Sequence, residues 1–274
     1  MRGVAGIFGG VALAAALVRC SSFESVPGDA GADASELDDA PALDEARPDA
    51  PADAPLDAGR CDSGCPGSGG PCAVRAGPTC IDATEVTVAD FRAFTESVQG
   101  TTLEVGAPCP PVTVGLLGAR PDESLPMTQV SFCEARAFCA WAGKRLCGKV
   151  GGGPIPTTGP SSGPTTQQAA WFNACTGGTA DPHPLLSDGG CQLGASGPRA
   201  AGSGCQGGVR GLVDMVGNVW EWIEYVGERD GATPAVFMIG GGYGHPPTST
   251  TCGSLVQATL PFRGPDVGFR CCSP

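Results

Sequence analysis

Hydrophobic residues recur at helical spacing in three short segments, and each segment follows a side chain that can cap a helix. In the first, Thr87 and Asp90 form a capping-box pattern, in which each side chain hydrogen-bonds to the other residue's backbone. The helix expected over residues 88–94 and the turn beyond them has one apolar face. That face carries Phe91, Phe94 and Val98.

The second segment has the clearest boundaries. Ser131 and Glu134 form another capping-box pattern, and Gly143 can adopt the left-handed conformation that ends a helix. These signals predict a helix over residues 132–142. Because both ends are marked by signals within the segment itself, the prediction does not depend on where the rest of the chain lies.

The third helix is expected after Thr165, which Gln168 follows three residues later, and it runs through a Trp-Phe pair to Cys175 and ends near Gly177. Strands are expected where aromatic and branched residues lie between glycine-rich turns. These segments are residues 218–226, 235–239 and 267–272. Few regular elements and many loops predict an irregular, loop-rich α+β domain.

Glycine, proline and cysteine are all abundant, with 44 Gly, 26 Pro and 15 Cys among 274 residues. So many breakers exclude a helical bundle, a coiled coil and a repeating βαβ enzyme, which need long periodic segments. A disordered chain would not need the cysteines, whereas an exported, loop-rich domain uses disulfides to hold irregular segments together. We therefore expect a disulfide-stapled, exported protein.

Residues 1–20 have the layout of a signal peptide. The apolar run over residues 4–18 is shorter than a membrane-spanning helix but suits the hydrophobic region of an export signal. It ends in a sequence that resembles the lipobox of bacterial lipoproteins, in which Cys20 would receive the lipid. Arg19 departs from the small residue usual at that position, so ordinary cleavage near residues 14–17 is the alternative.

Residues 21–59 carry eleven acidic residues and one basic residue, Arg47, among alanines and prolines. Such a segment buries too little apolar surface to fold, so we expect an extended acidic tether; a cation-binding tail is the alternative. Residues 60–274 are long enough for a single domain with a real core. They carry thirteen basic and seventeen acidic residues without a cluster of Lys and Arg, which argues against a nucleic-acid surface.

Generic catalytic and metal motifs find little support in the chain. Its two histidines, His183 and His245, are too few for a multi-histidine metal site or an H-E-x-x-H protease. Residues 159–163 match G-x-S-x-G without the strand, turn and helix of a nucleophile elbow. Residues 202–207 match G-x-G-x-x-G without a βαβ unit. No C-x-x-C pair suggests zinc, so the cysteines are expected in disulfides.

One segment carries a specific resemblance. Residues 217–222, Gly-Asn-Val-Trp-Glu-Trp, match the signature of the formylglycine-generating enzyme family, also called the sulfatase-modifying factor family. Other segments resemble that family's blocks in the same order. They are residues 83–87, 126–131, 139–146, 240–243 and 268–271. The resemblance implies that residues 60–274 adopt the family's irregular α+β fold, which is related to the C-type-lectin arrangement.

The resemblance also implies a calcium ion. Family members bind calcium through side chains at the positions of Asp214 and Glu221 and through backbone carbonyls at those of Gly217 and Val219. A hard cation prefers six to eight oxygen ligands, which a tight glycine-containing turn can direct inward. The alternative is a turn whose two carboxylates face solvent. The family's second calcium site has no clear match in this sequence.

The resemblance does not extend to the family's catalytic copper. Formylglycine-generating enzymes hold copper(I) through two cysteines, three and eight residues after the serine of a G-G-S segment. Here Gly242 replaces the serine, and His245 and Thr250 replace the cysteines. Cys252 lies two residues too late and is expected in a disulfide. We therefore expect no copper site and no formylglycine-generating activity; a mixed site of His245 and Cys252 is the remaining catalytic candidate.

One disulfide is implied by the resemblance, between Cys175 and Cys271, although the neighbouring Cys272 leaves that partner open. Cys191 and Cys205 enclose a Gly/Pro loop and are expected to pair locally. A further group of cysteines precedes the first expected helix and is expected to anchor the tether to the domain. Its members are Cys61, Cys65, Cys72 and Cys80.

Together these observations predict a calcium-containing binding or scaffold module of the cell envelope that lacks copper chemistry. Its expected partners are the membrane, through a lipid on Cys20, and an exported protein or peptide; we expect no nucleic acid and a monomeric chain. The expected location is the outer membrane, as a lipoprotein, or otherwise the periplasm or the medium. The alternative is a copper-dependent oxidoreductase that modifies a cysteine of an exported protein.

Overall fold

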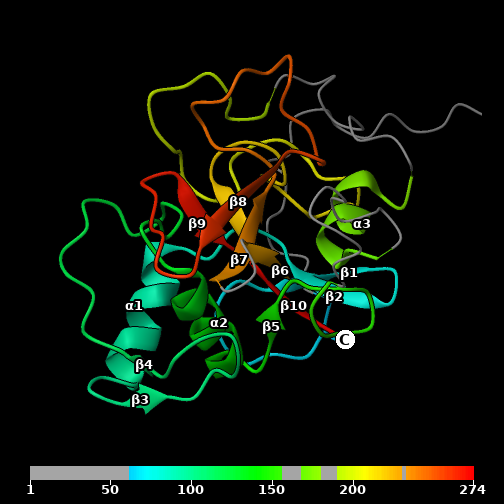
Figure 1. Ribbon diagram of the computed structural model, residues 1–274. Coiled ribbons are helices and arrows are strands. Elements are labelled where there is room, and N and C mark those ends of the chain that lie inside the picture. The colour runs from blue at the N-terminus through cyan, green and yellow to red at the C-terminus, as the bar shows by residue number, and fades with distance from the viewer. Residues whose placement is uncertain (1–61, 156–167, 180–189, 230–232) are drawn as a thin grey trace, which may run out of the picture. The chain divides into compact units, whose positions relative to one another are not determined.

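The computed structural model describes residues 62–155, 168–179, 190–229 and 233–274 (Figure 1). The expected signal peptide and tether lie outside these residues. Among the residues described, no helix is both long and apolar enough to cross a membrane. Three helices, two four-stranded sheets and a two-stranded ribbon make up their regular structure, which confirms an irregular α+β fold.

Two helices begin at their expected capping boxes. α1 spans Val88–Ser97 and α2 spans Phe132–Trp141. At the start of α1, the Thr87 hydroxyl accepts from the Asp90 N–H at 3.1 Å, and the Asp90 carboxylate accepts from the Thr87 N–H at 3.0 Å. The equivalent pair opens α2. Each box satisfies two backbone donors that a helix start would otherwise leave unpaired.

The third helix begins later than expected. α3 spans Ala170–Thr176 and ends at Gly177, which has a left-handed φ of 63°. No side chain caps its start, and Thr165 lies outside the described residues. Instead, the Ala170 N–H donates to the Gly148 carbonyl at 2.9 Å. A contact with a distant loop sets this boundary, so a local pattern could not place it.

The first sheet joins very short strands from distant parts of the chain. Its order is β1-β2-β10-β5, and all its pairs are antiparallel. The strands are β1 (Ala73–Ala76), β2 (Thr79–Asp82), β10 (Cys271–Ser273) and β5 (Arg145–Leu146). A separate ribbon pairs β3 (Thr102–Leu103) with β4 (Val112–Thr113).

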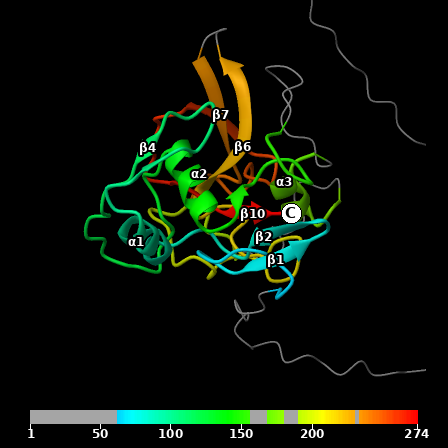
Figure 2. The ribbon, with the colours of Figure 1, turned by 90° about the horizontal axis from the view of Figure 1, so that it is seen from below.

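The second sheet contains the strand that carries the Trp-Glu-Trp sequence. β6 (Trp220–Arg229) and β7 (Thr233–Ile239) run side by side as an antiparallel hairpin (Figure 2). β8 (Leu255–Thr259) pairs antiparallel with β7, and β9 (Val267–Phe269) pairs parallel with β6. The order is therefore β8-β7-β6-β9.

The expectation of a single strand over residues 267–272 is wrong, because this segment is divided between the two sheets. β9 pairs with β6, and β10 pairs with β2 and β5. Arg270 is the residue between them, and its side chain is fully buried. Its guanidinium binds Glu221 of β6 and the Asp82 carbonyl at the end of β2. These bonds hold the chain where it passes from one sheet to the other.

Two hydrophobic clusters form the core of the described residues. The first contains a group of phenylalanines from α1, α2 and β9, and the second surrounds Trp171 of α3. Successive side chains of a strand point to opposite faces. Accordingly, Cys271 belongs to the first cluster and Cys272 to the second. β10 therefore separates the two clusters and contributes a cysteine to each.

Six disulfides join described residues, which fits a protein that folds in an oxidising compartment outside the cytoplasm. They are Cys65–Cys80, Cys109–Cys133, Cys139–Cys271, Cys147–Cys272, Cys175–Cys252 and Cys191–Cys205. Cys72 is disulfide-bonded as well. The expected local bond between Cys191 and Cys205 is confirmed.

The bond between Cys175 and Cys271 that the family resemblance implied is wrong. Cys175, on α3, lies in the second cluster and bonds to Cys252. Cys271 lies in the first cluster and bonds to Cys139 near the end of α2. The two cysteines belong to clusters on opposite faces of β10, and each has a nearer partner on its own face.

Candidate functional site

Three buried carboxylates and one buried arginine lie close together in the interior. Glu85 follows β2, Asp214 lies in the turn before β6, and Glu221 is the second residue of β6. Their exposed fractions are 0%, 0% and 1%, and that of Arg270 is 0%. The charge of Arg270 acts on all three carboxylates. We call these four residues the buried charged cluster.

Donors from Arg270 and Trp171 occupy the Glu221 carboxylate completely. Arg270 Nε donates to its two oxygens at 2.9 and 2.8 Å, and Arg270 Nη2 donates to Oε1 at 2.7 Å. Trp171 Nε1 donates to Oε2 at 2.6 Å. A carboxylate accepts about four hydrogen bonds. The other Arg270 hydrogen bonds go to the backbone carbonyls of Asp82, Ala83, Val213 and Asp214.

Backbone N–H groups of a neighbouring loop hold only one oxygen of Asp214. The backbone of Asp214 has a φ of 58°, in the left-handed region that Asp tolerates better than most residues. Oδ2 accepts from Gly202 at 2.8 Å and from Gly204 at 3.3 Å. A Cβ on Gly204 would lie 1.4 Å from Oδ1, so glycine is required there. Oδ1 is buried without a hydrogen bond, with Arg199 Nη2 3.8 Å away.

Glu85 also has a free oxygen. Asn218 Nδ2 donates to Oε1 at 2.9 Å, whereas Oε2 is buried without a hydrogen-bond partner. Burial first, and the charge of Asp214 second, raise the pKa of Glu85 well above its ordinary value. Asn218 Oδ1 accepts from the Arg199 N–H at 3.0 Å. Asn218 therefore connects Glu85 to the loop that binds Asp214.

The four expected calcium ligands are brought together only in part. Gly217 and Val219 lie in the turn with Asp214, whose Oδ1 is free, but Glu221 has no free acceptor position. The alternative of solvent-facing carboxylates is wrong, because both are buried. Within the described ranges, no three His, Cys, Asp or Glu side chains converge as metal ligands. The free oxygens of Asp214 and Glu85 are of the type that a hard cation prefers, whereas Glu221 has no free oxygen to offer one.

Glu85 and Arg270 had no expected role, although both lie in segments that carry the family resemblance. The available signal was a single charge in a short apolar segment, Thr-Glu-Val and Phe-Arg-Cys. Charged residues are almost never fully buried unless they are paired. Two such segments with opposite charges could therefore have indicated a buried cluster, but not which carboxylate Arg270 binds.

The positions that correspond to the family's copper ligands offer no thiol. Cys252 is fully buried in its bond with Cys175, as expected. The His245 ring packs edge-on against Trp220, with ring centroids 4.9 Å apart. Thr250 Oγ1 donates to a backbone carbonyl at 2.8 Å. The mixed site of His245 and Cys252 is wrong, because a disulfide sulfur is not a thiolate ligand.

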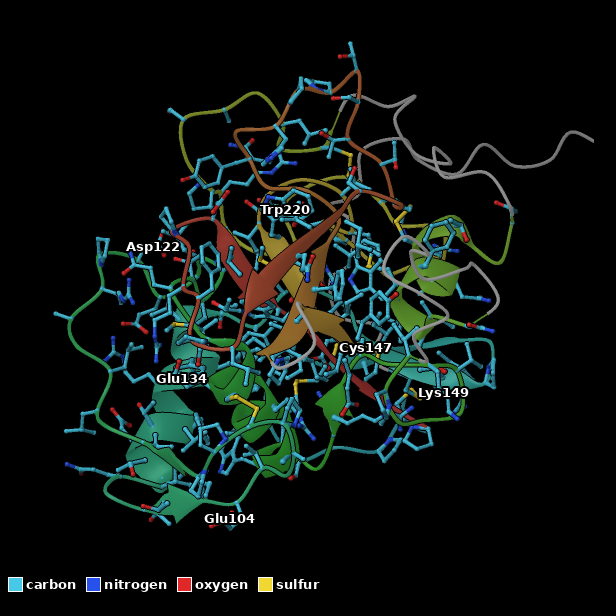
Figure 3. All side chains as sticks on the ribbon, in the orientation of Figure 1. Glu104, Asp122, Glu134, Cys147, Lys149 and Trp220 are labelled. Atoms are coloured by element: carbon cyan, nitrogen blue, oxygen red, sulfur yellow. A yellow bond between two sulfur atoms is a disulfide. The ribbon has the colours of Figure 1, made fainter. Side chains whose placement is uncertain are left out.

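Two loops, residues 190–204 and 240–250, form a continuous surface that we call the loop platform. The Ala195 N–H donates to the Tyr243 carbonyl at 2.8 Å and joins one loop to the other. In Figure 1 both loops lie above the second sheet, and Figure 3 places Trp220 where they meet it. Asp214 and Asn218 attach the first loop to the turn before β6, so the buried charged cluster supports the platform.

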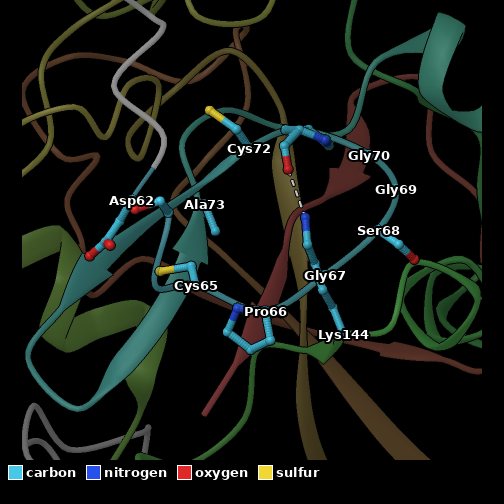
Figure 4. Close-up of a pocket in the computed structure, with 12 residues that line it drawn as sticks. Asp62, Cys65, Pro66, Gly67, Ser68, Gly69, Gly70, Cys72, Ala73 and Lys144 are labelled. Atoms are coloured by element: carbon cyan, nitrogen blue, oxygen red, sulfur yellow. Dashed lines mark hydrogen bonds between the residues drawn. The ribbon is translucent and has the colours of Figure 1, made fainter.

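A separate cavity of about 350 Å³ lies beside residues 62–73 (Figure 4). Lys144 lines it, and Lys144 Nζ donates to the Pro71 carbonyl and to Asp82 Oδ1, both at 2.6 Å. The Lys144 side chain is only 4% exposed. Because its charge is paired, Lys144 fastens this loop to β2 and does not present a free amine to the cavity.

The stability of the domain is expected to fall as the pH rises toward neutrality. Burial raises the pKa of Asp82 to about 7, although Lys144 opposes the shift. The folded protein therefore keeps a proton that the unfolded chain releases near pH 4. The resulting stabilisation is complete below about pH 4 and is lost as the pH rises through about 7.

Urea unfolding at several pH values between about 5 and 8 measures this effect, which is at most about 1.4 kcal/mol per pH unit for one group. Asp82→Asn cannot titrate, so its free energy of unfolding should depend less steeply on pH than that of the wild-type protein. Equal slopes for the two proteins would contradict the assignment to Asp82.

Comparison with known proteins gives a family match over most of the chain. Residues 48–188 and 199–273 match the sulfatase-modifying factor enzyme 1-like domain. Among solved structures, PvdO from Pseudomonas aeruginosa is 19% identical, with a TM-score of 0.49 over 71% of this chain and 79% of that one. CarF is 22% identical, with a TM-score of 0.45 over 77% and 96%.

Treponema denticola variable protein 1 is 20% identical, with a TM-score of 0.45 over 71% of this chain and 84% of that one. A comparison with curated proteins gives no match. The family match confirms the resemblance that the Gly-Asn-Val-Trp-Glu-Trp segment indicated. The chain belongs to the sulfatase-modifying factor enzyme 1-like domain family.

Proposed function

We propose that this protein is a binding or scaffold module of the cell envelope that carries out no copper chemistry. Its loop platform receives an exported protein or peptide. A lipid on Cys20 anchors the chain to the membrane, and the acidic residues 21–59 act as a tether that gives the domain reach. The domain acts as a single copy.

The observation that carries this proposal is the state of Cys252. Soft thiolates hold copper(I), and the sulfur of Cys252 is bonded to Cys175 instead. Gly242 and Thr250 bring no soft ligand, and His245 alone cannot replace a cysteine pair. The oxidoreductase alternative would need a reduced Cys252, which would break the covalent link between α3 and the loop before β8.

The second part of the proposal is a calcium ion at the buried charged cluster. Calcium would supply positive charge there and would take no part in a reaction. Asp214 and Asn218 connect this region to the loop platform through Gly202, Gly204 and Arg199. An ion that fixes the turn before β6 would therefore also order the platform, and a pre-ordered surface loses less entropy when it binds a partner.

The test uses mature protein expressed into an oxidising compartment. We expect no stoichiometric copper(I) and no conversion of the cysteine in a C-x-P-x-R peptide to an aldehyde, because no thiolate pair is available. Metal analysis measures the bound copper, and mass spectrometry of the peptide measures the conversion of its cysteine. Cys175→Ser, which frees the Cys252 thiol, is the matched variant. Stoichiometric copper together with peptide aldehyde in the wild-type protein would overturn the proposal.

The anchor is tested on the same protein in cells. Cys20→Ala should release the chain from the membrane fraction, because the acylated thiol is lost. If that variant remained with membranes as the wild-type protein does, the lipid anchor would be wrong, whereas the proposal for the platform would be unaffected.

A further inference from the structure

The hydrogen bonds of the buried charged cluster leave two carboxylate oxygens unused. Glu221 accepts from Arg270 and Trp171 at both of its oxygens. Asp214 Oδ1 and Glu85 Oε2 accept from no donor, and both residues are fully buried. A buried carboxylate oxygen without a partner is unfavourable, and native proteins rarely leave one. These two oxygens therefore point to a bound group.

The cluster also has too little positive charge. Three carboxylates share Arg270, all of whose N–H groups are already engaged. The Arg199 side chain is 31% exposed, and its Nη2 lies 3.8 Å from Asp214 Oδ1, beyond hydrogen-bonding distance. That Nη2 instead donates to the Gly190 carbonyl. Even when Arg199 is counted as an ion-pair partner of Asp214, three ionised carboxylates leave one negative charge uncompensated in the interior.

We infer that Glu85 and Asp214 together hold a hard divalent cation through Oε2 and Oδ1, and that Glu221 is not a ligand. Asn218 positions Glu85 through its other oxygen, and two backbone N–H groups position Asp214 in the same way. Each carboxylate is therefore oriented but keeps one oxygen available. Calcium accepts such oxygens and completes its shell with carbonyls and water.

Glu221 is excluded as a ligand because binding a cation would cost it existing hydrogen bonds. To bind a cation it would have to give up donors from Arg270 or Trp171, which would leave a buried guanidinium or indole N–H unpaired. The inference rests on the proposed function, because that proposal places calcium in this region. It replaces Glu221 by Glu85 in the ligand set.

The experiment compares three Glu→Gln variants of the full mature chain after the metal has been removed with EGTA. Calorimetric titration with calcium chloride measures affinity, and thermal unfolding with and without calcium measures the stabilisation. Glu85→Gln keeps an oxygen for Asn218 and should weaken calcium binding at least about tenfold, with loss of the thermal shift. Glu221→Gln should bind calcium with unchanged affinity despite its lower stability. Glu224→Gln, on the same strand but outside the cluster, is the matched control and should behave as the wild-type protein.

A crystal structure of the wild-type protein grown with calcium tests the same assignment without relying on a variant that folds. The ion is expected about 2.3–2.6 Å from Glu85 Oε2 and Asp214 Oδ1. Full calcium affinity in Glu85→Gln, or an ion bound to Glu221, would overturn the ligand assignment. The proposal that the protein binds calcium would be unaffected. A wild-type protein that binds no calcium would overturn both this inference and the calcium part of the proposed function.

Discussion

Replacing Arg270 by methionine is expected to lower the free energy of unfolding by about 3–5 kcal/mol, because it leaves Glu221 buried without its charge partner. The loss is larger because four backbone carbonyls at the junction of the two sheets also lose Arg270 as their donor. Methionine fills a similar apolar volume, so the effect reports the lost polar contacts more than a cavity. Urea unfolding followed by tryptophan fluorescence measures it.

The matched control is Arg75→Met. Arg75 pairs with Asp62 at 3.2 Å, but both side chains are largely exposed, at 45% and 36%. An exposed pair contributes at most about 1 kcal/mol. Adding Glu221→Gln to the Arg270 variant should recover part of its loss, because the uncompensated charge is then removed. Similar losses for the Arg270 and Arg75 variants would contradict the buried charged cluster.

Removing the bond between Cys139 and Cys271 is expected to cost about 5 kcal/mol. Together with Cys147–Cys272, this is the largest effect expected among the six disulfides that join described residues. The bonded residues are 132 apart in sequence, so the bond removes a large loop entropy from the unfolded chain. It also joins α2 to β10 inside the first hydrophobic cluster. The variant is Cys139→Ala with Cys271→Ala, measured by urea unfolding without reductant.

Cys191→Ala with Cys205→Ala is the control for this prediction. That bond spans 14 residues, so its loss should cost about 3 kcal/mol. The ordering of the two losses is the critical result. If the short-range bond contributed as much as the long-range one, the loop entropy argument would fail for this protein.

The local part of the fold could be predicted from the sequence. Thr87 and Ser131 begin helices because the residues that complete their capping boxes lie only three positions away. Cys191 and Cys205 pair across a short loop for a comparable reason. In each case both partners are close in the chain, so the pattern contains the whole interaction.

The non-local part could not be predicted in this way. β5 has two residues and β10 has three, too few to show an alternation of apolar and polar side chains. Their pairing is fixed by disulfides and by neighbouring elements. The expected partner of Cys175 is wrong for the same reason, because only the fold shows on which face of β10 Cys175 lies.

The sequence indicated two side chains of the candidate site, but neither the other two nor the hydrogen bonds among them. Asp214 and Glu221 emerge from a recognisable segment, and both are buried in one cluster. Which of them keeps a free oxygen depends on Arg270, 49 residues beyond Glu221, and on the loop that carries Gly202 and Gly204. Sequence spacing contains no information about such contacts.

The adjacent cysteines of β10 also limit the order in which disulfides can form in a chain that emerges N-terminus first. Cys271 and Cys272 follow their partners Cys139 and Cys147 by 132 and 125 residues. A chain that crosses the membrane N-terminus first exposes the earlier two thiols long before their partners arrive. They must stay reduced or form temporary bonds that are later exchanged. A compartment that supplies a disulfide isomerase as well as an oxidase would therefore suit the folding of such a chain.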